Sequence, residues 1–284
     1  MNRKKLAALI RRSVEIYTKH EMGIYGGNTT FYLMISFVPM MMMVISLVNI
    51  LPWFSVLDVS NLFLRVIPDI PLIRNELIRV LSNLNHQSGT LTASLFALTF
   101  LWSGSHGITA LMEGLEKINH TQNIYIRDKA KSILYAVLFC FLIPSMFIFQ
   151  MLRKSLQDII SQFFENLALP DVGVRVNQIL KISGIVTLLA MVLIIVMTYT
   201  YLPAGKRRIR DQLPGSILTC VLWVLFTNGF GFFIREFWTL SSVYGTLASI
   251  FLASMWLKFM IMFLFCGASL NRAIQVESSA DTMT

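Results

Sequence analysis

Charge is scarce in this chain. Asp, Glu, Lys and Arg together make up 14% of its 284 residues, whereas hydrophobic residues make up 55%. Soluble globular domains carry about 25% charged residues. The composition therefore does not suit a soluble globule, although the length would allow one or two such domains.

The residues that build disulfide frameworks and metal sites are few as well. The three cysteines, which all lie inside apolar runs, are Cys140, Cys220 and Cys266. They form no CxxC or Cys/His spacing, so we interpret them as small packing residues and expect no metal and no cofactor. The N-terminus also lacks the short apolar core and the cleavage site of a secretory signal peptide.

Acidic residues number only 15 and are scattered among the connections. Nuclease chemistry usually needs clustered carboxylates for metal ions, or paired acid–base groups near a phosphate. Glu113 and Glu116 lie three residues apart beside Lys117, and we interpret them as a solvated helix face. The sequence contains no Ser/His/Asp motif, phosphate-binding glycine loop or HExxH motif. We therefore predict that the chain is not an enzyme, and a nuclease is the enzyme class that it suits least.

Long apolar runs are the main positive feature. Residues 213–234 contain no charge, and residues 245–270 contain one, Lys258. Each run reaches the roughly 20 residues that a helix needs to cross about 30 Å of hydrocarbon. A backbone in lipid has to satisfy its own hydrogen bonds, which favours helices. We predict an all-α fold, a single membrane domain over 1–284 with six transmembrane helices at about 31–51, 91–112, 133–152, 182–202, 213–234 and 245–270.

The connections are too short for a soluble domain, because the longest, 52–90, has about 39 residues. Apolar residues at helical spacing in 52–90 and 153–181 predict short amphipathic external helices. A similar pattern within residues 1–29, rich in Lys and Arg, predicts an amphipathic helix on the inner leaflet. That helix could recognise acidic lipid headgroups or serve only as an anchor.

The net charge of +9 would suit a nucleic-acid-binding protein, but its positions indicate membrane topology. Fifteen Lys and Arg residues fall in the N-terminal segment, 114–132, 203–212 and the C-terminal tail, against eight in the opposite connections. The positive-inside rule then places both termini in the cytoplasm after six crossings. We expect membrane lipids as partners and no nucleic acid.

Lys258 is the strongest candidate for a functional residue within a span. A charge near the middle of a span costs roughly 3 kcal/mol on insertion scales, so it should face water or a partner. Snorkelling to the interface is the alternative, although about twelve residues separate Lys258 from either end of its run. A cavity-facing Lys258 could bind an anionic lipid or a small anionic substrate.

Other polar residues inside the predicted spans or directly after one are candidates for the same path: Ser103, Ser105, His106, Asn228 and Asn271. His106 could relay protons near neutral pH, or it could simply form a hydrogen bond between helices. Small residues at Ser216 and Cys220, and at Gly245 and Ser249, form two stripes that we expect to pack against each other.

Several stretches of the sequence form recognisable motifs: Thr29–Pro39 at the first span, Leu101–Ser105 with Asn119 at the second, Leu213–Ser216 with Leu222 and Trp223 at the fifth, and Tyr244–Leu247, Trp256 and Gly267–Asn271 at the last. Together they resemble the YihY/virulence factor BrkB family of inner-membrane proteins. The resemblance covers nearly the whole chain in order. Ser269 stands where the family usually has an acidic residue.

The resemblance implies a six-helix integral protein of the bacterial inner (cytoplasmic) membrane. Members of the family were long labelled ribonuclease BN, a label now generally regarded as mistaken, and others are linked to lipid movement. We therefore expect a transporter or lipid translocase. A non-transporting envelope scaffold or assembly protein is the alternative, favoured if no continuous polar cavity exists.

Overall fold

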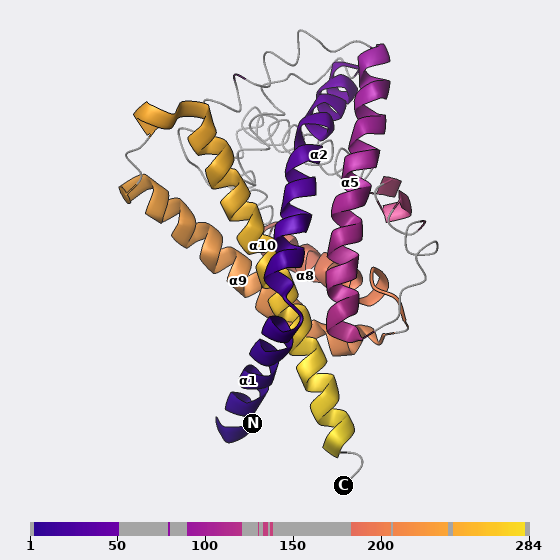
Figure 1. Cartoon of the computed structure of the whole chain (residues 1–284), viewed down its shortest axis with the longest axis vertical. Coiled ribbons are helices and arrows are strands. Elements are labelled where there is room, and N and C mark those ends of the chain that lie inside the picture. The colour runs from indigo at the N-terminus through magenta and orange to yellow at the C-terminus, as the bar shows by residue number, and fades with distance from the viewer. Residues whose placement is uncertain are drawn as a thin grey trace, which may run out of the picture.

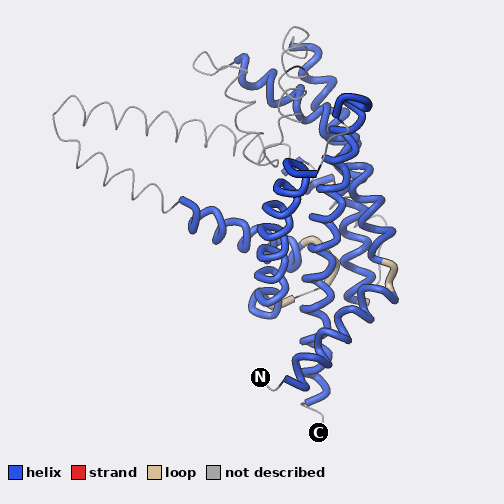
Figure 2. Tube along the Cα trace, turned by 90° about the vertical axis from the view of Figure 1, so that its left-hand side faces the viewer, coloured by secondary structure: helices blue, strands red, loops and turns tan. Residues whose placement is uncertain are grey.

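A computed structural model describes residues 3–50, 79, 90–120, 130, 133–135, 137–138, 183–205, 207–237 and 241–281. Within these ranges every regular element is a helix (Figures 1 and 2). The helices are α1 (Arg3–Lys19), α2 (Met22–Ile50), α5 (Thr90–Asn119), α8 (Ser183–Tyr201), α9 (Ile209–Phe237) and α10 (Ser241–Asp281). The all-α prediction is confirmed for the described part of the chain.

Three of these helices contain stretches that are long and apolar enough to cross a membrane, namely Ser94–Asn119, Ile209–Ile234 and Ile250–Ser278. Leu188–Tyr201 is a shorter apolar helix. Helices also cover the predicted first, second, fourth, fifth and sixth spans almost completely. The predicted span 133–152 and the connections 52–90 and 153–181 lie outside the described residues, apart from a few isolated positions.

The helices α2 and α5 form a long antiparallel pair (Figure 1). The rings of His20 and His120 lie 4.8 Å apart, which places the end of α5 beside the start of α2. Gly107 allows the two helices to approach closely, because a Cβ atom there would lie 3.0 Å from the side chain of Leu33. Such small residues are typical of helix interfaces in membranes, where dense packing replaces the hydrophobic driving force.

The helix α1 packs against the long α10, and both chain termini lie at the same end of the molecule (Figure 1). We call this the terminal end. Leu9 and Ser13 are buried on α1, whereas Ile10 and Val14 are exposed. The predicted N-terminal helix is therefore confirmed, and its buried face lies against protein. A left-handed residue, Glu21 with φ 55°, makes the turn into α2.

The core draws side chains from five helices and lies toward the terminal end. Phe265 of α10 is fully buried and fits against Gly114 of α5, where a Cβ atom would overlap its ring. The buried cluster around it comprises Met22, Ile108, Met112, Leu115, Ile118, Ile195, Tyr199, Leu202, Cys220, Ile261, Leu264 and Ala268. Large apolar side chains such as Leu98 and Leu225 are 65% exposed. An apolar outer surface of this kind suits contact with lipid.

Candidate functional site

Two glycines bring α9 and α10 into backbone contact near the terminal end. A Cβ atom on Gly215 would overlap the carbonyl oxygen of Gly267, and one on Gly267 would overlap Thr219. We call this place the crossing. The fifth and sixth spans pack against each other here and at Trp223, whose indole N–H donates to the Met260 carbonyl at 2.8 Å. The side chains of the predicted sixth-span stripe at Gly245 and Ser249 lie outside the described residues.

Asn271 is buried at the crossing and ties the two helices together. Its Oδ1 accepts a hydrogen bond from the backbone N–H of Gly215 at 2.7 Å. Its Nδ2 donates to the backbone carbonyl and to Oε1 of Gln212, at 3.2 and 3.1 Å. Hydrogen bonds between helices are costly to lose when the groups left behind are buried. The amide of Asn271 therefore fixes the register of α9 on α10.

The helix α8 joins the crossing through the buried Tyr199. Its hydroxyl donates to the Leu264 carbonyl at 2.6 Å and lies 2.8 Å from the hydroxyl of Thr219. Thr219 in turn donates to the carbonyl of Gly215 at 2.9 Å. Three helices thus share one hydrogen-bonded network, and its side chains carry no formal charge at neutral pH.

A charged cluster lies next to this network at the terminal end. Glu116 of α5 is only 1% exposed, and its Oε1 accepts a hydrogen bond from the N–H of Ala204 at 2.9 Å. Burial lowers the pKa of Arg207 below its ordinary value, the carboxylate of Glu116 opposes this shift, and Arg272 adds to it. The interpretation of Glu116 as a solvated residue is therefore wrong. Its carboxylate holds the α8–α9 connection instead.

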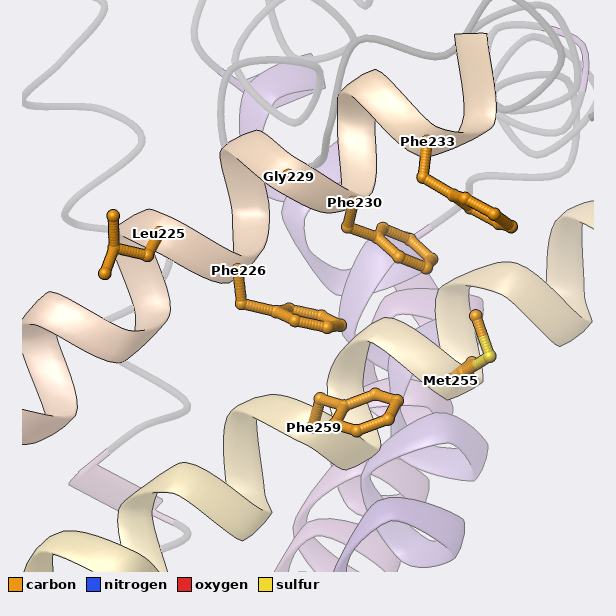
Figure 3. Close-up of a pocket in the computed structure, with 7 residues that line it drawn as sticks. All are labelled: Leu225, Phe226, Gly229, Phe230, Phe233, Met255 and Phe259. Atoms are coloured by element: carbon orange, nitrogen blue, oxygen red, sulfur yellow. The ribbon is translucent and has the colours of Figure 1, made fainter. Parts of the chain in front are cut away.

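An apolar groove of about 510 Å³ opens between α9 and α10 farther from the terminal end (Figure 3). Its lining residues are Leu225, Phe226, Gly229, Phe230, Phe233, Met255 and Phe259. The ring centroids of Phe226 and Phe259 lie 4.7 Å apart across the two helices. A Cβ atom on Gly229 would meet nothing within 4 Å, so this glycine leaves the groove open. The groove offers hydrocarbon contacts and no polar side chain.

Lys258 is exposed and is not one of the residues that line this groove. It directly precedes Phe259 and follows Met255 by three residues, which places it on the flank of α10 beside the groove. At helical spacing it also shares a face with Met262 and Phe265, which contact α2 at Gly26 and α5 at Gly114. Lys258 forms no hydrogen bond or ion pair with any residue that the structure describes. Its ammonium group can therefore reach a ligand.

Of the predicted polar residues of the second span, the two serines bond within their own helix and the histidine packs against α2. Ser103 and Ser105 are buried, and their hydroxyls donate to the carbonyls of Thr99 and Trp102, both at 2.8 Å. The ring of His106 packs edge-on against Tyr32 with the centroids 5.3 Å apart, and it also contacts Trp102. No contact in the described part of the chain joins these residues to Lys258.

The remaining two candidates lie in different surroundings. Asn228 is exposed and donates to the carbonyl of Val224, whereas Asn271 belongs to the crossing. Sequence reasoning missed the groove and the buried Tyr199 and Gln212. The run of phenylalanines at one-turn spacing, Phe226 and Phe230, is the signal that could have indicated the groove. Among the described residues, no group of three His, Cys, Asp or Glu side chains could hold a metal ion.

Comparison with known proteins places this architecture among membrane proteins. The putative ribonuclease-like protein YfkH of Bacillus subtilis is 22% identical over 258 residues, which are 90% of each chain. A UPF0761 membrane protein of Ralstonia nicotianae is 22% identical over 97% of this chain, and the match covers 60% of that relative. Another, from Xanthomonas campestris, is 33% identical over 27% of this chain and 18% of its own length. No solved structure matches the chain.

The family profile described as Virulence factor BrkB matches residues 13–283, which include all of the crossing, the groove and Lys258. The resemblance seen in the sequence motifs is therefore confirmed. This chain belongs to the virulence factor BrkB family.

Proposed function

We propose that this protein is a transporter of the bacterial cytoplasmic membrane that moves an anionic amphiphile, most simply a lipid, between leaflets. Six spans with both termini in the cytoplasm are part of the proposal, supported by the distribution of Lys and Arg along the sequence. The observation that carries it is the exposed Lys258 within a span, next in sequence to Phe259, which lines the apolar groove.

The two parts of this site have complementary chemistry. An ammonium group at this depth costs roughly 3 kcal/mol without a partner, and an anionic headgroup would remove much of that cost. The groove between Phe226 and Phe259 could hold the hydrocarbon chain of the same molecule. Since lipid is itself apolar, the groove would hold that chain by shape and dispersion contacts.

An enzymatic function is not part of the proposal. Glu116, the most deeply buried of the described acids, is occupied by the backbone of Ala204, and Glu113 lies one turn away on the same helix. YfkH carries a ribonuclease-like name, but a nuclease would require acid–base or metal-binding groups that converge on one face. We likewise propose no nucleic-acid partner, because the basic residues follow the ends of the apolar runs.

Reconstituted vesicles provide the test. A fluorescent phosphatidylglycerol is placed in both leaflets, and dithionite bleaches only the molecules that reach the outside. Losing the charge in Lys258→Met should slow exchange about tenfold, which corresponds to one charge-assisted contact of roughly 1.4 kcal/mol.

Lys258→Arg is the matched control, because it keeps the charge and should retain most of the rate. Equal rates for Lys258→Met and the wild type would contradict the assigned role of Lys258. A wild-type protein that exchanges no lipid would contradict translocation and favour the envelope scaffold.

A further inference from the structure

A second groove, of about 410 Å³, lies at the corner between α1 and the end of α5. We call it the basic groove. Its lining residues are Ala8, Arg11, Arg12, Glu15, Ile16, Lys19, His20 and His120. All except His120 come from α1 and the turn that follows it. Two segments far apart in the sequence therefore build this groove together, and it shares no residue with the crossing or the apolar groove.

Positive charge dominates the basic groove. Arg11, Arg12 and Lys19 are exposed cations, whereas Glu15 is the only carboxylate among the lining residues. None of the three cations forms an ion pair or hydrogen bond with a residue that the structure describes. A guanidinium group matches the geometry of a phosphate, because it can donate two parallel hydrogen bonds to two of the phosphate oxygens. The charges are thus available to an anion from outside the chain.

Two of the residues that line the groove are histidines in contact with each other. The rings of His20 and His120 meet edge to face at 4.8 Å, and each lies in a tight turn. His120 has a left-handed backbone with φ 54°. In the other turn the left-handed residue is Glu21, which follows His20 and has φ 55°. Burial, then His120, Lys19 and Lys117, lower the pKa of His20 below its ordinary value. Burial is the largest cause, and the positive groups around His20 add to it, so protonation of His20 is disfavoured.

The position of the groove suits the phosphate level of a bilayer. The candidate span of α5, Ser94–Asn119, carries Glu113, Glu116 and Lys117 in its last turns, and His120 follows directly. Cations just beyond the end of a span lie where the phosphates of anionic lipids are found, and each contributes to attraction of such lipids.

We propose that the basic groove binds the phosphate group of an anionic phospholipid. The groove would recognise the exposed oxygens of a phosphate group, which both phosphatidic acid and inorganic phosphate carry. The site does not depend on the proposed transport function, because a protein that moves no lipid could still hold one here.

Calorimetric titration of the full chain in a neutral detergent tests the proposal. One arm uses a short-chain phosphatidic acid and the other uses inorganic phosphate. The double variant Arg11→Gln/Arg12→Gln should bind phosphatidic acid about 30-fold more weakly than the wild type, since each cation contributes roughly a factor of five. The matched control is Arg208→Gln/Arg210→Gln, which removes two exposed arginines at the start of α9 and should change the affinity less than about threefold.

Size-exclusion chromatography of each variant checks that it is folded. If the first pair does not fold, Lys19→Gln/His20→Gln removes the other side of the groove and should weaken binding in the same way. Binding of phosphatidic acid alone would support the proposal and assign the site to lipid, whereas equal binding of inorganic phosphate would assign it to soluble phosphate. Equal weakening by the groove pair and the control pair, or no binding by the wild type, would overturn the proposal.

Discussion

The two ends of the α9–α10 pair are built in opposite ways. At the crossing, Gly215 and Gly267 bring the backbones together, and Asn271 bonds across them. At the apolar groove the same two helices meet through the rings of Phe226 and Phe259, and space remains beside Gly229. One end has a buried network of polar bonds and almost no free volume, whereas the other has free volume with a single kind of polar contact beside it, the indole N–H of Trp256 donating to the Thr227 hydroxyl at 3.2 Å.

This contrast follows from the solvent. In lipid, apolar side chains gain little by leaving their surroundings, so helices are held by close approach and by hydrogen bonds. The crossing has both and should behave as a fixed joint. The groove lacks the close backbone approach, and its phenylalanine rings can change rotamer at small cost, which suits a part that admits a ligand.

The largest effect is expected where the backbones touch. In Gly267→Ala the new methyl group would overlap the hydroxyl of Thr219 and the backbone carbonyl of Gly215, which cannot move as a side chain can. The free energy of unfolding should fall by about 3 kcal/mol, the cost of overpacking a tight interior. Gly229→Ala is the control, because nothing lies within 4 Å of its new methyl group. Thermal unfolding in detergent measures both, and equal stability would show that the crossing is not a fixed joint.

A smaller loss is expected from Asn271→Leu. The substitution leaves the buried Gln212 without its partner and removes the bond to the N–H of Gly215. Unfolding free energy should drop by about 2 kcal/mol, the penalty for buried polar groups left unpaired. Asn228→Leu provides the comparison, since Asn228 is exposed and bonds only within its own helix. If both variants lose equal stability, the amide of Asn271 does not join the helices.

The sequence predicted the parts of this contrast that depend on periodicity and composition. Long apolar runs predict helices, and glycine and small hydroxyl residues such as Ser216 predict where helices pack. The burial of Glu116 could not be predicted, because its partner Ala204 lies far along the chain and the carboxylate accepts a backbone N–H. The groove beside Lys258 was missed for a related reason. An apolar cavity depends on the angle between two helices, and a pattern along one helix does not contain that angle.

A test of the groove itself is the variant Gly229→Leu. The larger side chain would enter open space, so the fold should remain stable, but the groove would be partly filled. Under the proposed function, lipid exchange in vesicles should slow about tenfold, equivalent to about 1.4 kcal/mol. Asn228→Leu adds the same side chain one position away and should exchange lipid at the wild-type rate. Fast exchange by Gly229→Leu would mean that the substrate does not use this groove.

The smallest effect concerns pH. Because the pKa of His20 is lowered in the folded protein, its unfolded form binds more protons between that value and the ordinary one near 6.5. This part of the stability is complete above about pH 7.5 and is lost as the pH falls through about 6.5 toward the lowered value.

His20 faces His120, Lys19 and Lys117, with Arg11, Arg12 and Glu15 lining the same groove. In His20→Gln, thermal stability should therefore fall less between about pH 7.5 and about pH 5.5 than in the wild type. The difference should be small, because a single, partly exposed histidine causes it. The amides and hydroxyls of the crossing do not titrate in this range. If His20→Gln loses as much stability at low pH as the wild type, the acid sensitivity does not arise from His20. The carboxylate of Glu116 beside the crossing would then be the next group to test.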